Sequence, residues 1–157
     1  MISASLDQKL EGMGYPLDYH GKPGPLVIPA VIDGRIVYCS GAVPFDGDRL
    51  MCTGKVPSQT CLADAQRAAA LCAANCLRNA RAAVGALNRI ERVLRVTGYV
   101  NSDPGFTEQH LVINGASQLL VDLFGPEKGI HARTAIGTAN LPLGSSVEIE
   151  MILRLRE

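Results

Sequence analysis

The feature that most limits what this chain can fold into is a strict alternation of side chains near its C-terminal end. Successive side chains of a β-strand point to opposite faces of a sheet. Residues 147–156 are therefore predicted to form a strand with one apolar face and one mostly charged face. The apolar set, which needs a core, is Val147, Ile149, Met151, Leu153 and Leu155; the other set, which suits a polar or shared environment, is Glu148, Glu150, Ile152, Arg154 and Arg156.

A long amphipathic helix is predicted over residues 60–84. Small or apolar side chains recur there every three or four residues, polar residues stand between them, and Gly85 follows as a stop. A face lined by Ala allows a helix to pack closely on a sheet. The recurring positions are Leu62, Ala65, Ala69, Cys72, Cys76, Ala80 and Ala83.

The remaining elements are read from shorter patterns. Two β-rich runs, 26–32 and 35–40, flank Asp33-Gly34, which is a hairpin signal, and a second turn cluster covers 46–48. Residues 93–100 are rich in β-branched side chains and predict a strand. A second helix lies within 106–125, most clearly over 114–124, before the stop Gly125-Pro126. A short strand over 132–139 and a turn at 141–144 lead to the last strand.

The predicted order is β-β-α-β-α-β-β, an α+β domain over residues 25–157 whose antiparallel-rich sheet has both helices on one face. Residues 1–24 are expected to be an N-terminal appendage, with an amphipathic helix over 3–13 and an extended connector rich in Gly and Pro. Two helices cover one face of a sheet. The second face can be solvated, as in many antiparallel sheets, but its mixture of Ile152 with charged residues suits partial burial against another subunit.

Charge and cysteine content limit the classes of function. Fifteen basic and fifteen acidic residues cancel without long runs, which argues against nucleic acid as a partner. No stretch of 18 apolar residues occurs, so neither a signal peptide nor a membrane span is predicted. Five cysteines without a CxxC pair favour a reducing, cytoplasmic setting.

No metal site or cofactor is expected. Cys72 and Cys76 lie four residues apart in the Ala-rich helix, where small buried side chains are a better explanation than a metal-binding pair. His20, His110 and His131 are scattered singly along the chain.

The segment that starts at His131, HARTAIGTANLPLGSSVEIEM, resembles the closing signature of the RidA (YjgF) family, also called endoribonuclease L-PSP. That signature has an Arg-containing strand, a Leu-Pro turn and an alternating Val-Glu-Ile-Glu strand. Upstream, VYCSGAVP over residues 37–44 is similar to the family's strand ending in Ser-Gly-x-x-Pro. The order of elements agrees across residues 25–155.

The resemblance implies a chorismate-mutase-like subunit that forms a homotrimer with ligand pockets between subunits. It also implies hydrolysis of reactive 2-imino acids, such as 2-iminobutanoate and 2-iminopropanoate, and their enamine tautomers, to 2-oxo acids and ammonia. This is repair of damaging metabolites and needs no cofactor. Older family names refer to an endoribonuclease or translation inhibitor.

Four residues match the family's site. Arg133 corresponds to the arginine that holds the substrate carboxylate, a task suited to a planar guanidinium, although a strand-surface ion pair is the alternative. Glu148 matches the acid that handles water or a proton, with a solvated strand Glu as the alternative. Gly41 matches a glycine against the ligand, or is a plain strand-end glycine. Asn114 matches a site-proximal Asn, or is an N-cap.

Two departures point to a divergent subgroup. Active members of the family have a Tyr on the first strand, and the nearest residue here is Val27. Tyr15 or Tyr19 can take the role of that Tyr only if the connector folds back. Ala135 stands where many members have a Cys that is not the nucleophile. The insertion over 106–114 and the N-terminal segment agree with a changed pocket.

Two alternatives to imine hydrolysis remain at this point. One is a non-catalytic binder of a small 2-oxo or amino acid in the same pocket, which Val27 and Ala135 favour. The other is a ribonuclease, which zero net charge and the lack of a paired His constellation make a weaker candidate.

Overall fold

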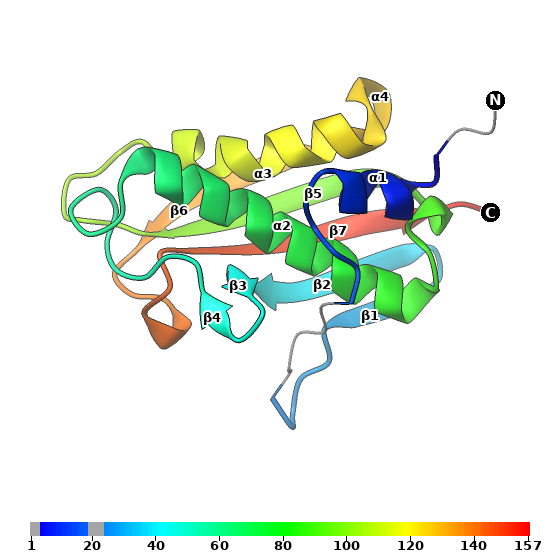
Figure 1. Ribbon diagram of the computed structural model, residues 1–157, viewed down its shortest axis with the longest axis horizontal. Helices are drawn as coiled ribbons and strands as arrows, with labels where there is room; N and C mark the ends of the chain where they lie inside the picture. Colours follow the sequence, from blue (N-terminus) through cyan, green and yellow to red (C-terminus); the bar gives the residue numbers. More distant parts are fainter. Residues whose placement is uncertain (1–3, 19–23) are drawn as a thin grey trace.

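The computed structural model describes residues 4–18 and 24–157. A five-stranded sheet forms one layer, and helices form the second layer on one of its faces (Figure 1). The strands of this sheet are β1 (Ala30–Asp33), β2 (Ile36–Ala42), β5 (Ile90–Asn101), β6 (Ala132–Thr138) and β7 (Val147–Leu155). The two main helices are α2 (Leu62–Val84) and α3 (Gln109–Phe124).

The sheet order is β1-β2-β7-β5-β6, with every pair antiparallel except β5 and β6. The last strand, β7, therefore lies in the middle of the sheet. Its apolar set is buried and its other set is half-buried along the whole strand, which confirms the predicted alternation. The α+β order predicted from the sequence is confirmed as well.

The core lies between the sheet and the helices and is built largely from Ala, Val and Leu. The predicted helix over 60–84 is α2, which begins after Cys61 and ends at Gly85. The thiols of Cys72 and Cys76 are buried and lie 3.6 Å and 3.2 Å from carbonyl oxygens of β7, at Val147 and Ile149. Both cysteines thus serve as small side chains at the contact between α2 and the sheet.

One sequence prediction in the first third of the chain is wrong and another is confirmed. The first strand begins at Ala30 and not at residue 26, because Pro29 has no N–H to donate to a sheet. The predicted turn over 46–48 is present, and it joins β3 (Phe45–Asp46) to β4 (Arg49–Leu50) in a small hairpin whose two-residue strands are too short to give a periodic pattern.

The amphipathic helix predicted over 3–13 is present as α1 (Leu6–Gly12), which packs on the rest of the chain through fully buried Leu10 and an ion pair between Asp7 and Arg81. The structure also adds short elements to the predicted plan. Short α4 (Pro126–Gly129) and the 3-10 turns η1 (Leu87–Arg89) and η2 (Pro142–Gly144) connect larger elements. The predicted domain boundary at residue 24 adjoins residues 19–23, outside the described part, and stays a prediction.

The sheet face opposite α2 and α3, called the open face below, is covered by no helix of the described residues (Figure 1). It carries the half-buried set of β7, together with cross-strand neighbours from β2 and β5. Tyr38 of β2 lies opposite Ile152 and is 46% exposed.

Candidate functional site

A pocket of about 300 Å³ opens where β2 and β7 meet the connector before β1. The pairing of β2 with β7 is interrupted between Cys39 and Ala42, and Gly41 lies in this bulge. Two predicted site residues, Gly41 and Glu148, line the pocket, and so does Val27. The complete lining is Gly24, Val27, Pro29, Ser40, Gly41, Ala42, Val43, Phe45, Asn75, Asn79, Pro142, Leu143 and Glu148.

The carboxyl group of Glu148 is the ionisable group of this pocket. Burial raises its pKa above the ordinary value for Glu, and the neighbouring charge of Glu150 raises it further. A carboxylate with a raised pKa is a better proton acceptor than a solvated one. Glu148 can therefore serve as a general base at neutral pH.

The glycine at position 41 makes room for this carboxylate. A Cβ atom added at Gly41 would overlap Oε1 of Glu148, so a larger residue would displace the acid. This close approach is a specific reason for glycine in the bulge, beyond that of a plain strand end.

Three other predicted residues form a second group at the far edge of the sheet. Nη1 of Arg133, on edge strand β6, donates to Oδ1 of Asn114 (2.8 Å) and to Oγ of Ser117 (3.1 Å) on α3. Ala135 lies two residues further along β6 and faces the same side as Arg133. The N-cap alternative for Asn114 is wrong, because α3 begins at Gln109 and places Asn114 inside the helix.

Arg133 is exposed and has no acidic partner within residues 4–18 and 24–157. None of the ion pairs among the described residues includes Arg133, so the ion-pair alternative finds no support there. His131 lies 3.1 Å from Oγ of Ser117, and its pKa is lowered mainly by burial and also by the charge of Arg133. Since the lowered pKa keeps His131 neutral at neutral pH, the guanidinium of Arg133 supplies the positive charge on the helix-facing side of this edge.

One chain does not bring the two groups together. Strand β5 lies between β7 and β6, so these two strands run about 10 Å apart, and Glu148 and Arg133 are also offset by three residues along β5, which is about 10 Å. Glu148 is paired with Tyr99 and faces the open side, whereas Arg133 is paired with buried Val96 and faces the helices. Each group is thus one half of a site.

Among the described residues, no tyrosine lines this pocket in place of the family's first-strand Tyr, where this chain has Val27. Val27 lies before β1 and is 55% exposed. Tyr15 packs against the core, and its pKa is raised by burial. The other proposed substitute, Tyr19, lies outside the described residues.

The sequence reading missed three polar residues near the two halves. Asn75 and Asn79 reach the pocket from α2, and Ser117 supports Arg133. Nδ2 of Asn75 donates to the carbonyl oxygens of Val43 and Phe45, both at 3.1 Å, and so fixes one pocket wall. The sequence does contain one signal for Asn75 and Asn79. They lie four residues apart in an Ala-rich helix, which places two amide side chains on the same face.

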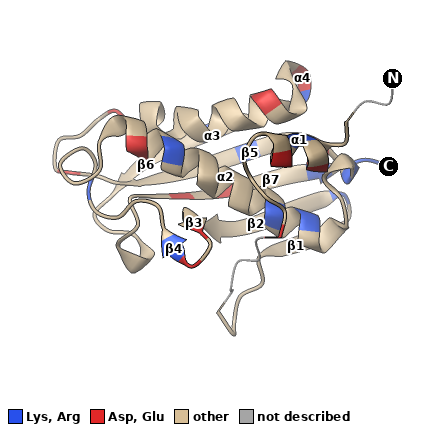
Figure 2. Cartoon of the chain, in the orientation of Figure 1, with Lys and Arg blue, Asp and Glu red and all other residues tan. Residues whose placement is uncertain are grey.

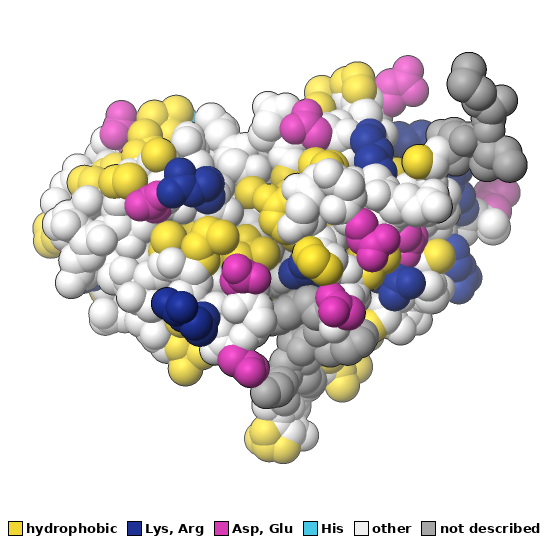
Figure 3. All heavy atoms as spheres, viewed as in Figure 1, with side chains coloured by type: hydrophobic (Ala, Val, Ile, Leu, Met, Phe, Trp, Pro, Cys, Tyr) yellow, Lys and Arg dark blue, Asp and Glu magenta, His cyan; other side chains and the backbone are white. Residues whose placement is uncertain are grey.

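Charges of both signs are interspersed over the helical side of the molecule (Figures 2 and 3). In the described part of the chain, no helix is long and apolar enough to cross a membrane. Groups of three or more potential metal ligands do not occur among the residues that the structure describes.

The mixed helix and sheet layers and the pocket at a strand bulge define a chorismate-mutase-like α+β protein. Residues 25–155 match the family described as "YjgF/chorismate mutase-like, putative endoribonuclease", and the chain belongs to this family.

Three relatives show how far the similarity extends. Protein TCP17 of Trypanosoma cruzi is 35% identical over 99% of this chain and 97% of its own length. The structure of Atu1372 from Agrobacterium tumefaciens, a protein of unknown function, is 42% identical with a TM-score of 0.89, and the match covers 98% of this chain and 94% of that one. A "putative endoribonuclease" from Shewanella oneidensis is 25% identical with a TM-score of 0.91, over 97% of this chain and all of that one.

Proposed function

We propose that this protein hydrolyses reactive 2-imino acids to 2-oxo acids and ammonia, at a site shared between two copies of the chain. The observation that carries the proposal is the division of the predicted site into two halves, with Glu148 on central strand β7 and Arg133 on edge strand β6, facing opposite sides of the sheet. One half offers a guanidinium that has no acidic partner in the described part of the chain, and the other offers a pocket with a carboxylate of raised pKa. A second copy supplies what each half lacks.

The chemistry of the two halves is complementary. Arg133, held by Asn114 and Ser117, binds the carboxylate of the imino acid. Glu148 accepts a proton from water as the oxygen attacks the imine carbon, and then returns it to the nitrogen of the resulting carbinolamine. As the C–N bond breaks, Glu148 accepts the hydroxyl proton and passes it to the departing ammonia, which leaves as ammonium. Iminium, carboxylate and water give a 2-oxo acid and ammonium, which balances atoms and charge. Positioning supplies most of the rate gain, because imines already react readily with water.

A non-catalytic binder of a small 2-oxo or amino acid is the second candidate. Val27 lines the pocket and has no hydroxyl group to orient water, which favours this alternative. An endoribonuclease is the weaker reading of the relatives' names, because basic and acidic residues are equal in number and His131 is engaged at the edge with Ser117.

The test is to generate 2-iminopropanoate and 2-iminobutanoate in situ from the amino acids and follow their loss. Faster loss with the wild-type protein, and no gain with Glu148→Gln, would support hydrolysis. Binding of 2-oxobutanoate without any acceleration would support the binder instead. Absence of both would refute the shared site.

The shared site requires an oligomer, and we expect a homotrimer. The open face has no helix of the described residues to cover it, and closed symmetry is the usual way to bury such a face. Light scattering at micromolar concentration should give a mass near three times 16.7 kDa. A monomer under these conditions would contradict both the assembly and the shared site.

The rate of hydrolysis should depend on the ionisation of Glu148. The reaction needs the carboxylate, so the rate should fall as the pH drops through a pKa that lies above the ordinary value of 4.5. The Glu150→Gln change removes the neighbouring charge that raises this pKa, so the acid limb of the pH–rate profile should move to lower pH. An acid limb that stays in place in Glu150→Gln would show that another group controls it.

A further inference from the structure

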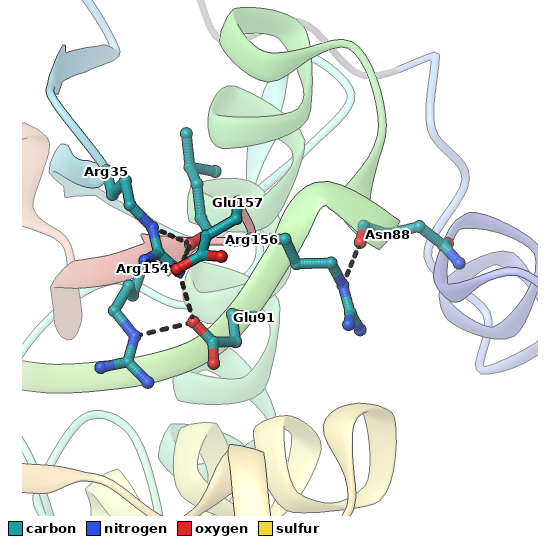
Figure 4. Close-up of polar contacts among 7 residues, drawn as sticks. Arg35, Asn88, Glu91, Arg154, Arg156 and Glu157 are labelled. Carbon is teal, nitrogen blue, oxygen red and sulfur yellow. Dashed lines mark hydrogen bonds and ion pairs between the residues drawn. The ribbon is translucent and has the colours of Figure 1, made fainter.

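The arginines of this molecule differ in the kind of group that holds them. At the end of the sheet where β7 finishes, Arg35 and Arg154 both donate to the same carboxylate oxygen of Glu91 (Figure 4). At edge strand β6, two neutral side chains of α3 hold Arg133 instead. A carboxylate partner cancels the charge of a guanidinium, whereas a neutral partner orients it and leaves its charge for an anion.

Both hydrogen bonds of Arg133 use one nitrogen atom. Nη1 carries two hydrogens, of which one goes to Oδ1 of Asn114 (2.8 Å) and the other to Oγ of Ser117 (3.1 Å). Within the described part of the chain, Nε and Nη2 make no hydrogen bond. These two atoms form a planar fork that binds a carboxylate through two parallel hydrogen bonds. The groups that hold Nη1 therefore set the direction of the fork.

A chain of hydrogen bonds fixes the hydroxyl group of Ser117. The carbonyl oxygen of Gly129 can only accept, so Nδ1 of His131, which lies 2.6 Å away, carries the proton. Burial lowers the pKa of His131, and the charge of Arg133 lowers it further, so the ring is neutral at neutral pH and Nε2 is an acceptor. Ser117 therefore donates to Nε2, at 3.1 Å, and turns its oxygen lone pairs toward Arg133.

The far end of this chain is fixed by packing. Gly129 is buried in α4, and a Cβ atom added there would overlap the backbone of α3 at Leu120. The N–H group of Gly129 also donates to the carbonyl oxygen of Gly125 (2.8 Å). The carbonyl group of Gly129 is thus a fixed reference point from which the ring of His131 is oriented.

We propose that His131 is a positioning residue for carboxylate binding, which acts through Ser117 to orient the guanidinium group of Arg133 toward the ligand. This inference rests on the proposed role of Arg133 as the carboxylate-binding residue. Without an acceptor at position 131, the hydroxyl group of Ser117 can turn back to a carbonyl group of its own helix. Arg133 then loses an aligned acceptor, and binding of the ligand must fix an orientation that the free protein no longer holds.

The test is calorimetric titration of 2-oxobutanoate into the wild-type oligomer and into matched variants, at neutral pH and without imine. His131→Phe keeps a ring but has no acceptor, so it should weaken binding about three- to tenfold. His131→Gln can offer its side-chain carbonyl oxygen to Ser117, so it should recover most of the lost affinity. His110→Phe makes the same change at an exposed position of α3 and should bind as the wild type does.

A double-mutant cycle separates positioning from general support of the fold. Ser117→Ala breaks the chain of hydrogen bonds at its middle, so adding His131→Phe to Ser117→Ala should weaken binding no further. Thermal unfolding and light scattering should accompany each titration. A purely structural role of His131 would lower the melting temperature of His131→Phe and His131→Gln alike, and the losses of affinity in the double variant would add.

Three results would overturn the inference: wild-type affinity in His131→Phe, no recovery in His131→Gln, or additive losses in the double variant. If His131→Phe does not assemble, equal affinities of His131→Gln and Ser117→Ala would also overturn it. A wild-type protein that does not bind 2-oxobutanoate would contradict the carboxylate site itself, and the inference with it. Normal binding without imine turnover would contradict hydrolysis alone and leave this test intact.

Discussion

Replacing Arg133 with Ala is expected to weaken binding of 2-oxobutanoate tens- to thousands-fold and to leave the melting temperature nearly unchanged. Loss of a charge-assisted, bidentate pair in a partly desolvated pocket costs about 2 to 5 kcal/mol, which corresponds to that range of affinity. The fold should tolerate the change, because Arg133 is exposed and donates to two side chains of α3 without an acidic partner among the described residues.

The control for charge is Arg133→Lys, which keeps the cation but loses the planar fork. Its affinity should fall between those of the wild type and Arg133→Ala. Calorimetric titration and thermal unfolding should be measured on all three proteins. An Arg133→Ala protein that melts earlier, or dissociates, but still binds 2-oxobutanoate normally would show that Arg133 serves the structure and not the ligand.

The fold was largely predictable because its central strand carries the strongest pattern in the sequence. An alternation over nine residues has one structural solution, and β7 has the predicted burial along its whole length. The starts of β1 and α3 were less predictable than the central strand, because individual residues there interrupt the regular pattern of apolar side chains. Pro29 cannot donate a backbone hydrogen bond, so β1 begins only after it. The first turns of α3 mix polar and apolar residues, so the sequence pattern predicted only the later part of this helix.

The candidate site was predictable as a set of residues but not as a geometry. The motif around Arg133 and Glu148 names both residues, yet their spacing does not reveal that β5 separates them or that they face opposite sides of the sheet. Supporting residues such as Ser117 belong to another element and have no motif of their own. To predict the geometry of the site, one needs the order of the strands in the sheet. That order depends on pairing between distant segments, which the local sequence patterns do not reveal.

Replacing Gly115 with Ala should destabilise the protein, although Ala is the better helix former. Gly115 lies inside α3, where Ala gains about 1 kcal/mol in helix propensity. An added Cβ would, however, overlap the backbone carbonyl oxygen of Gln66 on α2. Overpacking of this kind costs about 1 to 3 kcal/mol beyond what propensity returns, because a helix backbone cannot move aside as a side chain can. The melting temperature should fall by roughly 3 to 9 °C.

The matched control is Gly12→Ala at the end of α1, where an added Cβ meets nothing within 4 Å. The same substitution should there leave stability unchanged or raise it by less than about 1 kcal/mol. Thermal unfolding of both variants at one protein concentration separates the two effects. Equal stability of Gly115→Ala and wild type would mean that α3 can move away from α2 at little cost. If α3 does shift, Asn114 and Ser117 move with it, so Gly115→Ala should also weaken 2-oxobutanoate binding through Arg133.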